Sequence, residues 1–343
     1  MKTTSIAVAA ALILSISSTA QADTPFLKNI KQVTNGFEKA GEGYFSPNGK
    51  TIIYQAIRRE YPFYQIYTQP LNGTRPKLIS TGRGRTTCSF FSPDGKRILF
   101  ASSHRDPHLY KTEEGVRKQQ EEDRRTGRRR RYSWDFDPHM DIFETDLNGK
   151  ILRRLTKAHG YDAEGAYSKD GKKIAFCSSR DGDADIYIMN SDGSNVKQLT
   201  NKKGYDGGPF ISPNGKWVVY RTDRKKEHHL QIHVIGVDGK NDTALTTKPN
   251  WVNWGPYWHP HKPYIIWSGA DHSRRGRPNY DLWIARYTVK NGKFSIGKIR
   301  RVTNHPGADV LPVFSPDGKK LMWTTTRTKQ RTSQLFIADF KLD

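Results

Sequence analysis

A short motif that recurs along the chain constrains the fold more than any other feature. It consists of an aromatic or apolar residue, Ser-Pro or a variant of it, Asp or Asn, Gly and Lys, and an apolar stretch follows. The clear copies begin at Phe45, Phe91, Tyr167, Ile211 and Phe314. A degenerate sixth copy begins at Trp258. A motif that returns at a regular period is typical of repeat architectures.

The spacing of the copies indicates which architecture this is. Their second residues are at positions 46, 92, 168, 212, 259 and 315, which gives steps of 46, 76, 44, 47 and 56 residues. A unit of about 45 residues with four short strands is the period of a β-propeller blade. The sequence therefore predicts an all-β, six-bladed β-propeller. The long second step indicates an insertion in blade 2, at about residues 104–140.

The two ends of the predicted propeller complement each other. Blade 6 ends at Phe340 after its third strand, and Lys31–Asn35 matches Lys197–Asn201, the predicted fourth strand of blade 3. We therefore expect an N-terminal strand to complete the last blade, which removes two exposed sheet edges. An open solenoid of six repeats is the alternative, but it would not need complementary ends.

The first residues have the pattern of an export signal. Lys2 precedes the apolar run Ile6–Ile16, and Ala20-Gln21-Ala22 gives the small-x-small pattern that signal peptidase accepts. Because a bilayer span takes about 20 apolar residues, a retained anchor is the weaker alternative. We expect residues 1–22 to be removed, residues 23–343 to form the propeller, and the protein to be periplasmic or secreted.

Blade 3 carries the fullest copy of the repeat. It contains Ser178-Ser179-Arg180-Asp181-Gly182, and the segment Asp185–Thr200 reads Asp-Ile-Tyr-Ile-Met-Asn-Ser-Asp-Gly-Ser-Asn-Val-Lys-Gln-Leu-Thr. Together with Ser-Pro-Asp-Gly-Lys, these stretches resemble the repeat of the TolB-like propellers, also known as the PD40 or WD40-like repeat. The resemblance covers essentially all of the predicted mature chain and implies the six-bladed fold. It implies less about function, because this repeat serves in many binding proteins and in accessory domains of peptidases.

The resemblance also brings out a difference from TolB itself. TolB has a separate N-terminal domain before its propeller, whereas here the first repeat follows the predicted signal almost at once. We therefore do not carry over a role in a Tol-Pal-like system.

The charge of the chain narrows the class of partner. Its 57 Lys and Arg against 34 Asp and Glu give a formal net charge of +23. Such a surface attracts polyanions. Because export is predicted, we expect an acidic protein segment, an acidic polysaccharide or another anionic envelope component as partner, and no specific nucleic acid.

The basic residues concentrate in the predicted loops between second and third strands, which a propeller gathers on one face. We predict there a cationic mouth that holds an anionic ligand, because arginine binds carboxylate, sulfate or phosphate in a bidentate manner. The candidate ligand-binding residues are Arg105, Arg128, Arg129, Arg130, Arg131, Arg180, Arg224, His228, Trp251, Trp254, Arg274 and Arg327.

Structural roles compete for several of these residues. Arg105, Arg180, Arg224 and Arg327 occupy equivalent repeat positions, and acids recur near the starts of the blades, at Asp162, Glu164, Asp206 and Asp309. These registers predict salt bridges between blades. Arg128–Arg131 is expected in a mobile flap that is too polar to pack, with a solvated charge run as the alternative. The indoles of Trp251 and Trp254 suit stacking on sugars, but such rings also pack between blades.

The sequence contains none of the common catalytic motifs, neither Gly-x-Ser-x-Gly nor His-Glu-x-x-His nor a phosphate-binding loop. Asp181, Asp183 and Asp185 lack the Glu that follows in a calcium loop, so we assign no metal or cofactor. Cys88 and Cys177 are expected as buried free thiols. We predict a monomeric binding scaffold. A polysaccharide lyase or related hydrolytic enzyme, acting on acidic sugars at the same face, is the alternative.

Overall fold

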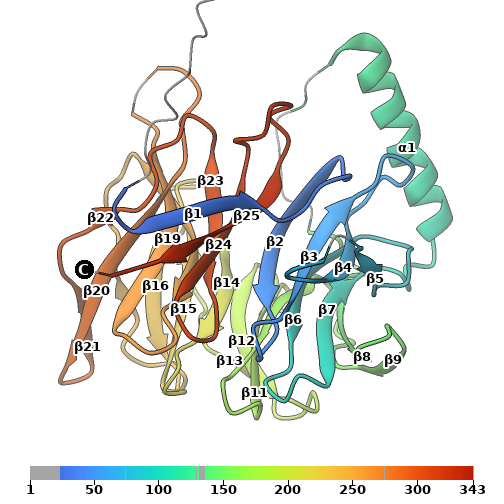
Figure 1. The fold of residues 1–343 in the computed structure, drawn as a ribbon. Coiled ribbons are helices and arrows are strands. Elements are labelled where there is room, and N and C mark those ends of the chain that lie inside the picture. Colours follow the sequence, from blue (N-terminus) through green and yellow to red (C-terminus); the bar gives the residue numbers. More distant parts are fainter. Residues whose placement is uncertain (1–23, 74, 129, 131–135, 274, 343) are drawn as a thin grey trace, which may run out of the picture.

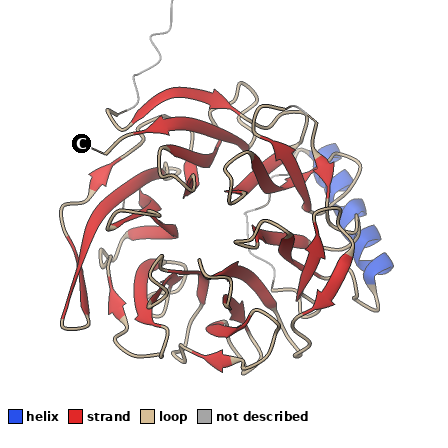
Figure 2. Cartoon of the chain, turned by 60° about the horizontal axis from the view of Figure 1, so that its bottom comes forward, coloured by secondary structure: helices blue, strands red, loops and turns tan. Residues whose placement is uncertain are grey.

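The computed structural model describes residues 24–73, 75–128, 130, 136–273 and 275–342. Six antiparallel sheets surround a central axis as the blades of a propeller (Figures 1 and 2), which confirms the predicted fold class. No helix in these ranges is both long and apolar enough to span a membrane. The predicted export signal, residues 1–22, lies outside the described residues.

The first three blades each contain four strands in chain order. Blade 1 consists of β2 (Lys39–Phe45), β3 (Thr51–Ile57), β4 (Gln65–Pro70) and β5 (Lys77–Leu78). Blade 2 consists of β6 (Thr86–Phe91), β7 (Arg97–Ser102), β8 (Asp141–Asp146) and β9 (Ile151–Arg154). Blade 3 consists of β10 (Asp162–Tyr167), β11 (Lys173–Ser178), β12 (Asp185–Asn190) and β13 (Lys197–Gln198).

The other three blades follow the same plan with two variations. Blade 4 consists of β14 (Asp206–Ile211), β15 (Trp217–Thr222), β16 (Gln231–Gly236) and β17 (Thr243–Ala244). Blade 5 consists of β18 (Trp251–Trp258), β19 (Tyr264–Asp271), β20 (Asp281–Lys290), β21 (Lys293–Ile296) and β22 (Arg300–Arg301). Blade 6 consists of β23 (Asp309–Phe314), β24 (Lys320–Thr325), β25 (Gln334–Phe340) and the N-terminal β1 (Leu27–Gln32).

The ring is closed by the N-terminal strand, as predicted. β1 pairs antiparallel with β25, from Leu27 opposite Phe340 to Gln32 opposite Phe336. The last blade therefore contains both ends of the described chain (Figure 1). Closure satisfies the edge of β25 that would otherwise be unpaired.

The apolar core lies between neighbouring blades. One buried cluster joins Leu99 and Ile142 of blade 2 to Ile174 and Phe176 of blade 3, and the other blade interfaces have similar clusters. Cys88 and Cys177 are buried and free. Because each blade buries its faces only against its neighbours, the ring depends on all of its interfaces.

The insertion in blade 2 differs from the flap that we expected. It contains the helix α1 (Leu109–Thr126), which lies along the outer edge of the ring (Figure 2). The helix buries none of its side chains completely, but the Glu113 carboxylate pairs with Arg83 at 2.6 Å and accepts the backbone N–H of Gly84 at 3.0 Å. The expectation that so polar a segment cannot pack was wrong, since this helix is attached by charged groups instead of an apolar face.

Candidate functional site

The strand order separates the loops into two faces (Figure 1). The Ser-Pro-Asp-Gly turns lie at one end of the blades, which we call the turn face. The opposite end, the loop face, carries the connections between second and third strands. Among the described residues these are 58–64, 103–128, 130, 136–140, 179–184, 223–230, 272–273, 275–280 and 326–333.

Three of the predicted arginines at equivalent repeat positions are paired with acids. The distances between their Nη2 atoms and the carboxylates are 3.1 Å for Arg180–Asp162, 2.6 Å for Arg224–Asp206 and 2.8 Å for Arg327–Asp309. Each pair joins the inner strand of a blade to the residue just after its second strand. The salt bridges therefore lie within blades and not between them, and they compensate the charge of these arginines.

Glu164 is the member of the predicted acid set that does cross a blade interface. Its carboxylate accepts hydrogen bonds from the Tyr205 hydroxyl at 2.9 Å and from Arg221 Nη2 at 3.1 Å, both contributed by the blade 4 side of the interface. The backbone N–H of Gly208 also donates to it. Glu164 thus links blade 3 to blade 4 close to the axis of the ring.

A β-bulge shared by the inner strands explains how acids reach the axis. In every blade the register of the inner strand shifts between its third and fifth residues, and the residue at the shift has a left-handed backbone. In blades 1, 2 and 3 the residues are Glu42, Cys88 and Glu164, with φ of 46°, 53° and 58°. A bulge changes the direction of a side chain, and such bulges are common beside functional sites.

Two residues further along the inner strands, aromatic rings fill the centre of the ring. Tyr44, Phe90, Phe210 and Tyr257 come from blades 1, 2, 4 and 5 and contact one another, with ring centroids 5.0 Å apart for Tyr44–Phe90 and for Phe210–Tyr257. Because the inner strands run from the loop face to the turn face, Glu42 and Glu164 lie on the loop-face side of these rings. The aromatic rings therefore form the floor beneath the acidic groups.

Glu42 is the most unusual of these groups. Burial and the charge of Glu164 raise the pKa of Glu42 to about 7. Its carboxylate accepts a long hydrogen bond of 3.4 Å from the Tyr44 hydroxyl, and no ion pair joins it to a Lys or Arg in the described part of the chain. Near neutral pH this carboxyl can exchange a proton.

The predicted tryptophans differ in their surroundings. Trp254 is half-buried, with the Arg221 guanidinium 5.9 Å from its ring centre and Tyr280 packed edge-on at 6.2 Å. Trp251 instead packs against Trp283 at 5.3 Å and lies under the ammonium of Lys248. Trp254 therefore continues the Glu164–Arg221 network, and we call the group Glu42, Glu164, Tyr205, Arg221 and Trp254 the channel mouth.

The remaining predicted ligand residues lie on the periphery of the loop face. Arg105, Arg128 and His228 are exposed, and Arg130 pairs with Asp123. Arg129, Arg131 and Arg274 lie outside the described residues. Arg105 and Arg128 form no ion pair within the described ranges, although the hydrogen bond from Arg130, helped by the charge of Arg128, lowers the pKa of the Asp123 carboxyl. Their role in ligand binding stays a prediction.

Sequence reasoning missed Glu42, Tyr205 and Arg221. A signal for Arg221 was present, because it occupies a second-strand position that holds Ala101 in blade 2 and Ser268 in blade 5. An arginine where sister strands carry a small residue indicates a special environment. Glu42 and Glu164 share a register position, but no sequence pattern marked the bulge.

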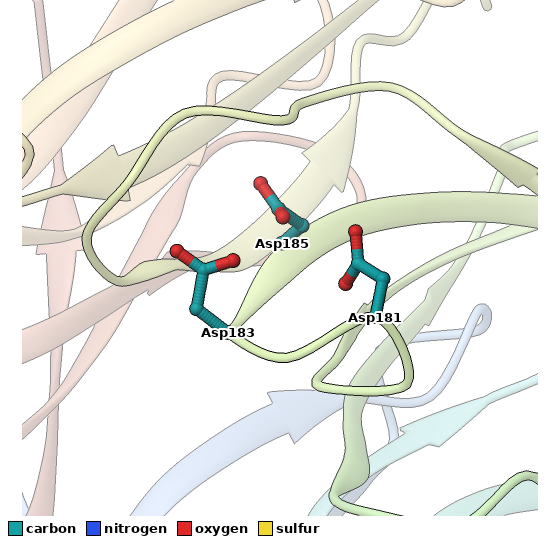
Figure 3. A group of neighbouring side chains, drawn as sticks. All are labelled: Asp181, Asp183 and Asp185. Carbon is teal, nitrogen blue, oxygen red and sulfur yellow. The ribbon is translucent and has the colours of Figure 1, made fainter.

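A separate acidic group lies in blade 3. Carboxylate oxygens of Asp181, Asp183 and Asp185 are all within 4.8 Å of one another (Figure 3). Burial and the charges of Asp206, Asp183 and Asp181 raise the pKa of Asp185 to about 7, although a hydrogen bond from Thr200 opposes the shift. Carboxylates are the ligands that Ca²⁺ prefers, so these are the side chains among the described residues that could hold a hard cation.

Comparison with known proteins supports the architecture. The family model "TolB beta propeller domain" (PD40) matches residues 125–278. No curated protein matches the chain in sequence. The structure resembles a putative TolB from Agrobacterium tumefaciens with a TM-score of 0.57 at 19% identity, covering 88% of this chain and 91% of that one.

Two further solved structures have the same fold. TolB from Acinetobacter baumannii gives a TM-score of 0.55 at 19% identity over 90% of this chain, which spans 65% of that protein's length. An oligogalacturonate lyase solved in complex with manganese gives 0.55 at 15% identity, covering 93% of this chain and 95% of that one. At these identities the likeness is one of fold. Residues 125–278 therefore match the TolB propeller family model, and the whole chain forms a six-bladed β-propeller with the fold of these TolB structures.

Proposed function

We propose that this protein is an exported binding scaffold whose loop face recognises an anionic partner. The supporting observation is the contrast between two sets of cations on that face. The repeat-position arginines Arg180, Arg224 and Arg327 are neutralised by aspartates, whereas Arg105 and Arg128 are exposed and form no ion pair within the described residues. Uncompensated cations attract anions, and compensated ones contribute little to that attraction.

Other exposed cations on the loop face support the same function. Blade 4 presents Lys225 and Lys226, and blade 5 presents Arg275 and Arg277. These side chains form no ion pair in the described part of the chain. The loop face therefore has an uncompensated positive rim around the mixed-charge channel mouth. The export pattern of residues 1–22 supports a periplasmic or secreted location.

The test compares the two faces at equal charge. One variant carries Arg105→Ser, Arg128→Ser, Lys225→Ser and Lys226→Ser on the loop face. The matched control carries Lys50→Ser, Lys96→Ser, Lys172→Ser and Lys216→Ser, which removes four exposed lysines from the turn face. Binding of labelled polyglutamate and polygalacturonate is measured at about 50 mM and about 200 mM NaCl, since phosphate-like and carboxylate contacts weaken steeply with salt.

We expect the loop-face variant to lose at least tenfold in affinity for the polyanion that binds, and the turn-face variant to lose less than threefold. Equal losses from both variants would mean that net charge alone attracts the polyanion. Absence of binding to either polymer at low salt would contradict the proposed function. A pull-down from envelope extracts, with wild-type protein and the loop-face variant, then identifies the partner.

A lyase remains the second candidate because the fold is shared with the oligogalacturonate lyase. The loop face also presents His229 and His272, whose ring centres are 6.1 Å apart, and His272 Nε2 lies 2.9 Å from the Tyr280 hydroxyl. Within the described residues these histidines have no third His, Cys, Asp or Glu arranged with them as a metal site. Ultraviolet absorbance of unsaturated uronide products after incubation with polygalacturonate would support the lyase function. Absence of this absorbance would favour the binding scaffold.

A further inference from the structure

An open pocket of about 480 Å³ lies on the loop face at the seam where the ring closes. It is lined by the segment Gly36–Glu38, which leads from the closing strand to blade 1, by residues 58–60 of the first loop, and by Arg124 at the end of α1. The pocket is thus built from three segments that are separate in the sequence. It is distinct from the channel mouth.

The pocket contains arginines whose charge is poorly compensated. Arg58 lies over the rings of Phe37 and Tyr67, at 5.3 Å and 5.5 Å from their centres. Neither Arg58 nor Arg59 forms an ion pair within the described ranges, and Arg124 approaches Glu38 only to 3.8 Å. Cation–π contact with two rings restricts the Arg58 guanidinium, which lowers the entropy that binding an anion would otherwise cost.

The pocket also contains two acids, Glu38 and Glu60, and both are exposed. This mixture of charges favours one class of anion over another. A polyuronate has a carboxylate on every sugar and would place some of them beside these glutamates. A peptide can place acidic side chains against Arg58 and Arg59 while its backbone N–H groups donate to the glutamates.

The pocket lies beside the hydrogen bonds that join blade 1 to blade 6, so a bound ligand would affect the closure of the ring. The backbone N–H of Ala40 donates to the backbone carbonyl of Ser333, in the blade 6 loop, at 2.8 Å. Gln334 Nε2 donates to the backbone carbonyl of Phe37 at 3.0 Å. A ligand that contacts Phe37 and Arg58 therefore contacts residues joined directly to blade 6. A ligand that binds the folded ring but not the unfolded chain would raise the unfolding temperature of the protein.

We propose that the closure-seam pocket binds an acidic peptide segment of the partner, through the guanidinium groups of Arg58, Arg59 and Arg124. This inference rests on the proposed function and assigns its partner class. It places the specific contact at blade 1, whereas the cations elsewhere on the loop face supply longer-range attraction.

The probes are a labelled peptide of five Asp-Ser repeats and an oligogalacturonate of about ten sugars, both tested by fluorescence anisotropy on the full mature chain at low salt. The variant is Arg59→Ser/Arg124→Ser, which leaves the stacked Arg58 in place so that packing of Phe37 is retained. The matched control, Lys225→Ser/Lys226→Ser, removes the same charge from the blade 4 loop. Circular dichroism and thermal melting check that both variants are folded.

We expect the pocket variant to lose at least tenfold in affinity for the peptide and the control to lose less than threefold. The peptide should also raise the unfolding temperature of the wild type but not that of the pocket variant. If both variants lose affinity equally, the pocket is not the contact, although the loop face still binds anions. If the sugar polymer binds more tightly than the peptide, the partner class is wrong. If the wild type binds neither probe, the proposed function fails as well.

Discussion

Blade 3 differs from blades 2 and 5 in how it neutralises one buried aspartate. In all three blades the third strand begins with an Asp, namely Asp141, Asp185 and Asp281, all buried. In blade 2, Arg154 from the fourth strand pairs with Asp141 at 2.6 Å, and in blade 5, Arg301 pairs with Asp281 at the same distance. In blade 3 the equivalent residue is Gln198, which donates hydrogen bonds to Asp181 and Asp185 but brings no charge.

The other three blades show what the repeat does when the acid is absent. Their third strands begin with Gln65, Gln231 and Gln334, and the corresponding fourth-strand residues, Leu78, Ala244 and Gln32, are uncharged. The acid and the arginine thus occur together or not at all, with blade 3 as the exception. A buried carboxylate without a cation is costly, so the consequence should appear in the stability of blade 3.

A second contact at this position is the same in all six blades. The hydroxyl of a Ser or Thr just after the fourth strand accepts a backbone N–H from the second residue of the third strand. In every blade except blade 4, the same hydroxyl also hydrogen-bonds the side chain of the first residue of the third strand. Thr156, Thr200 and Thr303 serve the aspartate blades, and Ser80, Thr246 and Thr34 occupy the equivalent place in the others. The difference between blades is therefore one of charge and not of backbone geometry.

The largest effect is expected when blade 2 is given the arrangement of blade 3. Arg154→Gln leaves Asp141 buried without its cation, and we expect a loss of about 2 kcal/mol in the free energy of unfolding at pH 7. The figure is below that of a fully buried pair because the Arg154 side chain is 30% exposed. Urea denaturation measures it, with Lys157→Gln as a control for the loss of one exposed charge. A loss no larger than that of the control would contradict the role of the pair.

An intermediate effect is expected from Asp185→Asn, and it should depend on pH. The pKa of Asp185 is about 7 in the folded protein, against about 3.8 as its ordinary value. Between these pH values Asp185 is protonated in the folded state but ionised in the unfolded state. The contribution of Asp185 to the stability of the wild type is therefore fully present below about pH 4 and is lost as the pH rises through 7. We compare the free energy of unfolding of the variant with that of the wild type at each pH. From pH 4 to pH 8 this difference should shift in favour of the variant by about 1–2 kcal/mol.

Unfolding of wild type and variant at the two pH values measures this difference. Glu42, whose pKa is also about 7, and Asp281, at about 6, change the stability in the same direction, but they do so equally in both proteins and cancel in the comparison. Parallel stability curves for the two proteins would show that Asp185 is not the group concerned.

The smallest effect is expected from Gln198→Arg, which gives blade 3 the cation that blades 2 and 5 have. We expect a gain of about 0.5–1 kcal/mol at pH 8, because a partly exposed ion pair contributes modestly. At pH 4, where Asp185 is protonated, the gain should disappear. A variant that is equally stabilised at both pH values would have gained packing and not a salt bridge.

The fold could be predicted from the sequence because its determinants are local and repeated. The Pro-Asp-Gly turns fix each hairpin, and Lys31–Asn35 matches a fourth strand closely enough to reveal the closure. α1 could not be recognised by the same reasoning, since it has no apolar face for periodicity to reveal. Its helix-forming residues and the pair Glu114–Lys118 were the available signals.

The site could be predicted only in part. The register of Arg180 with Asp162 was visible in the repeat, but whether a pair lies within a blade or between blades depends on the twist of the sheets. Glu42 was missed because its environment is made by Cys88 and Glu164 of other blades, which only the closed ring brings together. Contacts at the axis of a propeller join residues that are far apart in the sequence, so the sequence of a single repeat does not predict them.

The most direct test of the central claim is hydrogen–deuterium exchange of the mature chain with and without the Asp-Ser peptide. We predict slower exchange in the loop-face segments, above all in residues 36–40 and 58–64, and no change in the Pro-Asp-Gly turns. Protection confined to the turn face, or spread evenly over both faces, would contradict the assignment of the loop face as the binding surface.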